Sequence, residues 1–96
     1  MHVLLCYDIS KDRNRTKLAK YLEKEGYVRL QKSVFVGKGK FKEHKKVFNK
    51  LKEWVNEDTD SLVLVPLLVH QLREAWHYSN GSKPHELIDL PDHIFI

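Results

Sequence analysis

The chain has 96 residues, of which 42% are hydrophobic and 31% charged, a composition typical of one globular domain rather than of a disordered or fibrous chain. No apolar run approaches the roughly 20 residues that a membrane span needs, and the first residues lack a secretory pattern. Cys6 is the one cysteine, which excludes an intramolecular disulfide. We therefore expect a cytoplasmic protein without a membrane partner. The net charge of +4 is unevenly distributed, because residues 10–52 carry 15 Lys and Arg against 4 Asp and Glu, whereas residues 53–96 carry 2 against 8. This asymmetry points to an anionic partner on one side of the molecule, with lysine-rich solvated helix faces as the simpler alternative.

The first half of the chain predicts a strand, a helix and a second strand. Residues 3–8 are apolar almost without interruption up to Asp8, as in a strand covered on both faces. Asp12 is expected to cap a helix that runs to about residue 25, with Gly26 just beyond its end. Residues 27–36 alternate apolar and polar side chains, which predicts one continuous strand.

The second half predicts a second amphipathic helix and further strands. Apolar residues recur at helical spacing over residues 41–56, and an acidic turn follows at residues 57–60. Residues 62–65 form another continuous apolar strand, which Pro66 should kink. We also expect a short strand near residues 74–80 that ends in a turn at Asn80-Gly81, and an apolar tail over residues 86–96.

This order of elements predicts an α+β fold, the ferredoxin-like β-α-β-β-α-β sandwich, over a single domain of residues 1–96. The first and third strands of that fold are central, and we assign the two continuous apolar runs to these places. Both runs are apolar on two faces although the helices cover only one. We therefore expect a homodimer packed through the sheet face, in which residues 86–96 of one copy add an edge strand to the partner's sheet.

An acid at a strand end with basic residues close behind it points to nucleic acid. A carboxylate in the position of Asp8 can hold a hard divalent cation, and the bases that follow can hold a phosphodiester. These bases are Lys11, Arg13, Arg15 and Lys17.

Several short motifs together resemble the CRISPR-associated Cas2 family, the small protein of the adaptation pair, over residues 1 to about 69. They are Tyr7-Asp8-Ile9-Ser10, Asp12-Arg13, Arg15, Gly26-Tyr27, Gln31-Lys32-Ser33-Val34-Phe35 and Val65-Pro66-Leu67. The resemblance implies a ferredoxin-like homodimer, metal-dependent cleavage of RNA or DNA, and a role in spacer acquisition in which the dimer bridges two dimers of the adaptation integrase.

The resemblance also implies roles for individual residues. Asp8 matches the metal-binding position and Tyr7 the tyrosine beside it, and these two are the candidate catalytic residues. The candidate nucleic-acid-binding residues are Arg13, Arg15, Lys17, Arg29, Ser33 and Phe35. Lys17 keeps the positive charge but cannot grip a phosphate with two parallel hydrogen bonds as arginine does.

These residues support a specific hypothesis for phosphodiester cleavage. Mg²⁺, or Mn²⁺ in its place, can activate water and neutralise the charge that develops, and it often needs only one or two carboxylates besides water and phosphate. We expect a two-fold axis to bring two copies of Asp8 to one shared metal, with Arg15 and Arg29 orienting the phosphate and Phe35 stacking on a base.

Two alternatives remain open from the sequence. The first is a non-catalytic dimeric scaffold that binds DNA through its basic half. The second is a toxin-type messenger ribonuclease of the same fold. A zinc site is disfavoured, because the six histidines and the cysteine have no dense ligand spacing.

Overall fold

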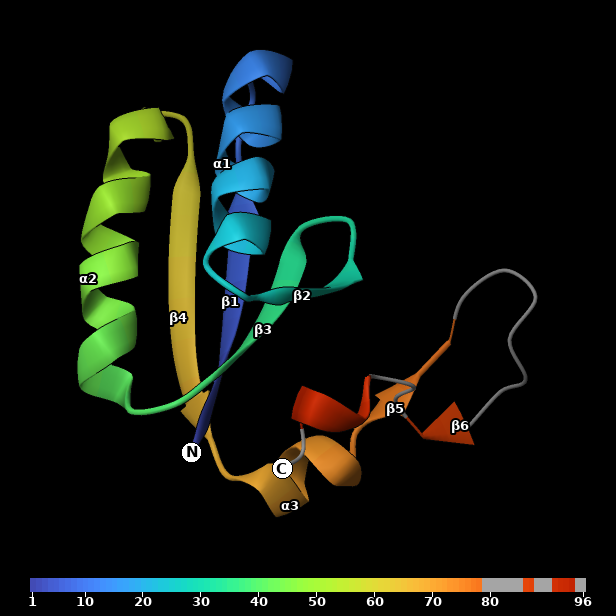
Figure 1. Ribbon diagram of the computed structural model, residues 1–96. Coiled ribbons are helices and arrows are strands. Elements are labelled where there is room, and N and C mark those ends of the chain that lie inside the picture. Colours follow the sequence, from blue (N-terminus) through green and yellow to red (C-terminus); the bar gives the residue numbers. More distant parts are fainter. Residues whose placement is uncertain (79–85, 88–90, 95–96) are drawn as a thin grey trace.

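The computed structural model (Figure 1) describes residues 1–78, 86–87 and 91–94. The turn expected at residues 80–81 lies outside these residues. The main body consists of β1 (His2–Asp8), α1 (Asp12–Lys24), β2 (Val28–Gln31), β3 (Val34–Lys38), α2 (Phe41–Leu51) with a 3₁₀ turn (Lys52–Trp54), and β4 (Ser61–Leu67). It continues with α3 (Val69–Arg73), β5 (Trp76–His77), β6 (Glu86–Leu87) and a second 3₁₀ turn (Asp92–Ile94).

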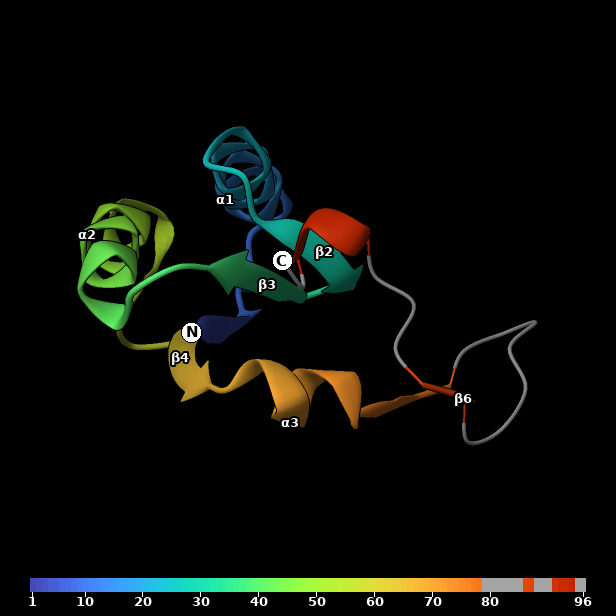
Figure 2. The same ribbon diagram turned by 60° about the horizontal axis from the view of Figure 1, so that its bottom comes forward.

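The four long strands form one antiparallel sheet in the order β2-β3-β1-β4. This is the β-α-β-β-α-β arrangement expected from the sequence, and the α+β, ferredoxin-like prediction is confirmed. Both long helices lie on one side of the sheet and α3 lies on the other (Figure 2). The homodimer stays a prediction, because the structure contains one chain.

The single strand expected at residues 27–36 is wrong. The chain forms two antiparallel strands there, β2 and β3, joined by a turn at Lys32-Ser33. The alternation of apolar and polar side chains continues across this turn, and neither Gly nor Pro marks it, so the pattern did not reveal the reversal. A register shift between Arg29 and Gln31 accommodates the pairing.

The placement of the second apolar run in the centre of the sheet is also wrong. β4 pairs with β1 alone and is an edge strand, whereas β3 lies in the centre between β2 and β1. The expected kink at Pro66 is absent, since β4 keeps its register and pairs Pro66 with Val3. An edge strand tolerates proline because one side of its backbone has no strand to bond.

The core is divided by the sheet into two layers. The layer under α1 and α2 contains the larger cluster, with Leu5, Tyr7, Leu18, Leu22 and Phe35 among its buried members. On the opposite face a smaller cluster joins Val36 of β3 to Leu72 of α3 and to Ile94. In this single chain β6 pairs with β5, and the exchange of residues 86–96 between two copies stays a prediction.

Candidate nucleic-acid site

The two candidate catalytic residues lie on opposite faces of the sheet. Successive side chains of a strand alternate between faces. Tyr7 lies in the helix-covered layer and is only 7% exposed. Asp8 is exposed and pairs in register with Ser61 of β4, on the face that α1 and α2 do not cover.

Tyr7 is held inside the fold rather than presented to solvent. Its hydroxyl donates a hydrogen bond to the Lys32 carbonyl at 3.3 Å, and its ring stacks on Phe35 with 6.3 Å between ring centroids. Burial raises the pKa of the Tyr7 hydroxyl, an effect that the nearby Arg29 and Arg15 guanidinium groups oppose. The hydroxyl is therefore neutral at physiological pH, which suits a hydrogen-bonding role and not that of a base.

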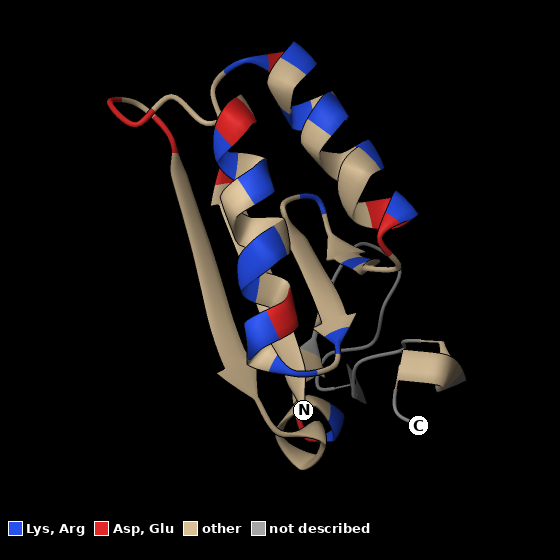
Figure 3. Ribbon diagram, turned by 60° about the vertical axis from the view of Figure 1, so that its left-hand side comes forward, with Lys and Arg blue, Asp and Glu red and all other residues tan. Residues whose placement is uncertain are grey.

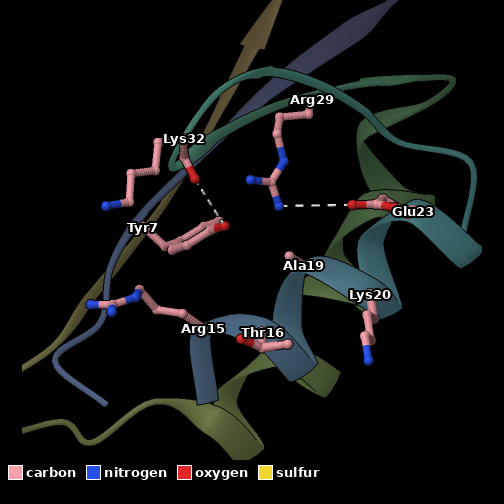
Figure 4. A pocket seen from close by; sticks show the side chains of 8 residues that line it. All are labelled: Tyr7, Arg15, Thr16, Ala19, Lys20, Glu23, Arg29 and Lys32. Atoms are coloured by element: carbon pink, nitrogen blue, oxygen red, sulfur yellow. Dashed lines mark hydrogen bonds and ion pairs between the residues drawn. The ribbon is translucent and has the colours of Figure 1, made fainter. Parts of the chain in front are cut away.

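A cavity of about 370 Å³ opens beside Tyr7, between α1, β2 and the β2–β3 turn (Figure 4). Four of its lining side chains are basic and one is acidic. The lining residues are Tyr7, Arg15, Thr16, Ala19, Lys20, Glu23, Arg29 and Lys32. An excess of positive charge around an aromatic floor can hold a phosphate of a nucleic-acid backbone.

Arg29 is the most available guanidinium group of this cavity. Its Nη2 atom lies 3.7 Å from Glu23 Oε1, and its guanidinium carbon lies 5.0 Å above the centre of the Phe35 ring. A single long ion pair leaves most of its five donors free for a phosphate.

Arg15 is more strongly engaged within the chain. Its Nη1 donates to the Ile9 carbonyl at 2.9 Å, and its Nη2 pairs with the Asp12 carboxylate. Asp12 itself is the first helical residue of α1, with Lys11 in the capping position where Asp12 was expected. Arg15 thus ties the start of α1 to the segment that follows β1, besides lining the cavity.

The remaining candidates are dispersed. Arg13 and Lys17 are exposed on α1 and do not line the cavity. Ser33 is half-buried in the β2–β3 turn, where its carbonyl accepts a hydrogen bond from the Tyr7 N–H at 3.1 Å.

Phe35 cannot stack on a base as we expected. Its side chain is fully buried in the centre of the sheet, below Tyr7 and Arg29. The reason is that β3 is a central strand, so a side chain directed to its helix face becomes core. The part of the prediction that stacks Phe35 on a nucleotide is therefore wrong for this chain.

A metal ion bound at Asp8 would need more ligands than one chain supplies. The described residues contain no cluster of three or more His, Cys, Asp or Glu side chains suited to a metal. Within that part of the chain the Asp8 carboxylate is exposed and takes part in no hydrogen bond or ion pair. One free carboxylate fits Mg²⁺ or Mn²⁺ when water, phosphate and a second carboxylate complete the shell.

The sequence indicated no functional role for two residues of this region. Lys32 lines the cavity, but it was noted only as a member of the Gln31–Phe35 motif. Asp60 was assigned to a solvated turn, yet it accepts hydrogen bonds from the Ser10 and Asn56 backbone N–H groups, which lower its pKa to about 2. The available signal for Asp60 was its Asx-type turn sequence, which does not reveal a partner fifty residues away.

Basic residues also cover the outer surfaces of both long helices (Figure 3). Those of α2 include Lys42, Lys45, Lys46 and Lys50, all exposed. Every helix among the described residues is too short or too polar to cross a bilayer.

The comparisons with known proteins agree with this architecture. Residues 1–75 match the family model described as CRISPR associated protein Cas2. The chain is 32% identical over 76 residues to a CRISPR-associated endoribonuclease Cas2 of Aeropyrum pernix, covering 79% of this chain and 83% of that one. It is 38% identical over 64 residues to a CRISPR-associated endoribonuclease Cas2 of Archaeoglobus fulgidus, covering 67% and 68%.

The fold likewise matches solved structures. Cas2 of Streptococcus pyogenes superposes with a TM-score of 0.71 and 25% identity, over 82% of this chain and all of that chain. A hypothetical protein of Thermus thermophilus superposes with a TM-score of 0.62 and 26% identity, over 70% and 80%. The strand-end acid, the basic cavity beside Tyr7 and these matches lead to one conclusion: the chain belongs to the CRISPR-associated Cas2 family.

Proposed function

We propose that this chain acts as a homodimeric, metal-dependent endonuclease that cleaves RNA or DNA phosphodiesters, with two copies of Asp8 holding one Mg²⁺ or Mn²⁺. The names of the relatives as endoribonucleases favour RNA. The observation that carries the proposal is the position of Asp8, exposed and unpaired within the described residues, on the sheet face that α1 and α2 leave uncovered.

The same face offers the apolar surface that a second copy would bury. Cys6 and Asp8 share this face with their β4 partners Val63 and Ser61, because directly paired residues of antiparallel strands point to the same side. Val63 is 50% exposed and Val65 43% exposed. A two-fold contact over these valines would bring the two Asp8 carboxylates to the same end of the interface if its axis ran along the strands, and the proposal requires this orientation.

In this proposal the two faces of the sheet at the end of β1 have different roles in cleavage. Asp8 would hold the Mg²⁺ or Mn²⁺ ion, and a bound ion would supply an activated water and neutralise the charge that develops on the phosphate. Arg29 and Lys32 would hold another phosphate of the same backbone in the cavity. Tyr7 fixes the β2–β3 turn through its bond to the Lys32 carbonyl and thereby orients the cavity wall.

The test compares the wild type with Asp8→Ala, using Asp58→Ala as a control that removes one exposed carboxylate from a nearby turn. Each protein is incubated with labelled RNA, single-stranded DNA and duplex DNA, in Mg²⁺ and in EDTA. We expect Mg²⁺-dependent cleavage in the wild type and in Asp58→Ala, and none in Asp8→Ala. Equal cleavage by repurified Asp8→Ala would refute the metal site.

A second function, a DNA-binding scaffold for the adaptation integrase, is favoured by the exposed lysines on α2 (Figure 3). This helix covers the sheet face opposite to the one that carries Asp8. It predicts salt-sensitive binding of duplex DNA that Asp8→Ala retains, and co-purification with the integrase. About six phosphate contacts would give a log-log salt slope near −5. Growth arrest on expression without the integrase would instead favour the toxin-type ribonuclease.

A further inference from the structure

The backbone that follows Asp8 is fixed from several sides before the chain enters α1. The Ile9 side chain is 1% exposed in the core, and its carbonyl accepts the Arg15 hydrogen bond. The Ser10 N–H and the Ser10 hydroxyl both donate to Asp60 Oδ1, each at 3.0 Å. One carboxylate oxygen thus holds the second residue beyond Asp8 by its backbone and by its side chain.

The Asp60 carboxylate is itself held in place by its own turn. The Asn56 N–H donates to Oδ2 at 3.0 Å, and the Thr59 hydroxyl donates to Oδ1 at 3.1 Å. The donors around it keep the pKa of Asp60 near 2, so the group is fully ionised at neutral pH. Hydrogen bonds to an ionised acceptor are stronger than those between neutral groups.

The register of the sheet brings this contact directly to Asp8. Asp8 pairs with Ser61, and Asp60 is the residue before Ser61. The contact between Asp60 and Ser10 therefore closes the end of the β1–β4 ladder immediately beyond Asp8. Since Lys11, in the capping position of α1, makes no side-chain cap hydrogen bond, Asp60 orders a segment that a capping residue would otherwise order.

We infer that Asp60 is a positioning residue for Asp8, which sets the direction of the Asp8 carboxylate by anchoring Ser10 to the turn before β4. The inference rests on the proposed function, in which Asp8 holds the metal. A carboxylate that must meet its symmetry copy at one ion tolerates little displacement, because a shift of about 1 Å in a reacting group can cost about 100-fold in rate.

The experiment uses the full-length protein with Asp60→Ala, Asp60→Asn and Ser10→Ala, beside the charge-matched control Asp58→Ala. The Asp58 carboxylate makes no hydrogen bond or ion pair within the described residues, and only its N–H bonds to Asn56. Three quantities are measured: amide exchange of Ser10 by NMR, line broadening of the Asp8 amide by Mn²⁺, and kcat and KM for cleavage. Thermal melting identifies any variant that fails to fold.

We expect Asp60→Ala to raise the exchange rate of the Ser10 amide by about 10-fold or more, since a charge-assisted hydrogen bond is lost. We expect it to weaken Mn²⁺ broadening at Asp8 and to lower kcat by about 10- to 100-fold with little change in KM. Asp60→Asn keeps one acceptor oxygen and should recover part of each loss. Ser10→Ala keeps the backbone donor and should be milder, and Asp58→Ala should match the wild type.

The outcomes separate this inference from the proposed function. If the wild type cleaves and Asp60→Ala matches Asp58→Ala in Mn²⁺ broadening and kcat, the positioning role is overturned and the metal site at Asp8 stands. If the wild type neither broadens at Asp8 nor cleaves, the proposed function is overturned, and the positioning role is overturned with it. If Asp60→Ala unfolds, Asp60→Asn and Ser10→Ala provide the test. Wild-type values of Ser10 amide exchange, Mn²⁺ broadening at Asp8 and kcat in both variants would contradict the positioning role of Asp60.

Discussion

The guanidinium group of Arg29 lies over the ring of Phe35, with its central carbon 5.0 Å from the ring centroid. Arg29 is exposed and Phe35 is fully buried, so the pair connects the basic cavity to the core of the sheet. The aromatic ring holds the planar cation in place without consuming its N–H donors, which remain available for a phosphate. The sequence made both residues candidates for nucleic-acid binding, but in the structure only Arg29 is exposed to a ligand, and Phe35 supports it from the core.

We expect Arg29→Ala to weaken binding of RNA and duplex DNA, and to reduce the log-log salt slope by about one. Arg29→Lys should retain the charge and the slope while losing the stacked geometry. Fluorescence anisotropy across a salt series measures the affinity and the salt slope of each variant. Lys38→Ala, which removes an exposed charge at the end of β3 and outside the cavity lining, is the matched control. An unchanged slope in Arg29→Ala would mean that the cavity does not contact phosphate.

We expect Phe35→Ala to lower the free energy of unfolding by about 3–5 kcal/mol, because it leaves a cavity among Leu5, Tyr7 and the helices. Phe35→Leu, which fills more of that volume, should cost less. Denaturant titration measures the loss. Binding of nucleic acid by the folded protein should fall by no more than in Arg29→Ala, because the buried Phe35 ring acts on the phosphate only through Arg29. A folded Phe35→Ala protein that binds more weakly than Arg29→Ala would contradict this supporting role.

The exposed valines on the sheet face opposite α1 and α2 give a prediction about the oligomeric state. Val63→Lys should leave the single chain folded, since Val63 is half exposed, but should prevent dimerisation by burying a charge in the interface. Sedimentation at micromolar concentration should show a monomer that no longer cleaves. Asn49→Lys makes a comparable change of charge on an exposed position of α2 and should leave the oligomeric state unaltered. Identical sedimentation of the two variants would place the dimer contact elsewhere.

His44 gives the protein a pH dependence that is independent of its activity. The imidazole is buried on α2, where it forms a hydrogen bond with the Tyr27 hydroxyl, and burial lowers the pKa of His44. The His44 imidazole therefore takes up a proton more readily in the unfolded chain than in the folded chain. Its contribution to the free energy of unfolding is complete above about pH 6.5 and is lost as the pH falls below that value.

This dependence can be measured by denaturant titration between pH 5 and 8. His44→Gln should show a shallower fall in the free energy of unfolding below pH 6.5 than the wild type does. His70→Gln, which removes an exposed histidine of α3, should reproduce the wild-type slope. Parallel curves for all three proteins would show that His44 carries no part of the dependence. Asp60 does not interfere, because its pKa is about 2 and it titrates in a more acidic range.

The sequence alone determined the first strand, the two long helices and the charged residues that these elements carry. The apolar run up to Asp8, the helical periodicity of α1 and α2 and the Gly26 position, which adopts φ +90°, depend on neighbours within a few residues. Local patterns of this kind record burial and backbone preference directly. The basic half of the chain and the acid at the strand end likewise required no knowledge of the fold.

The tertiary structure decided which residues meet. The turn at Lys32-Ser33 and the edge position of β4 follow from strand pairing. An alternating pattern shows which side chains share a face of a strand, but it does not show which strand pairs with it. Pairing then decided that Phe35 is core, that Tyr7 and Asp8 face opposite sides, and that Asp60 reaches Ser10 across fifty residues. The physical reason is that each of these contacts depends on register between distant segments, and no local preference encodes that register.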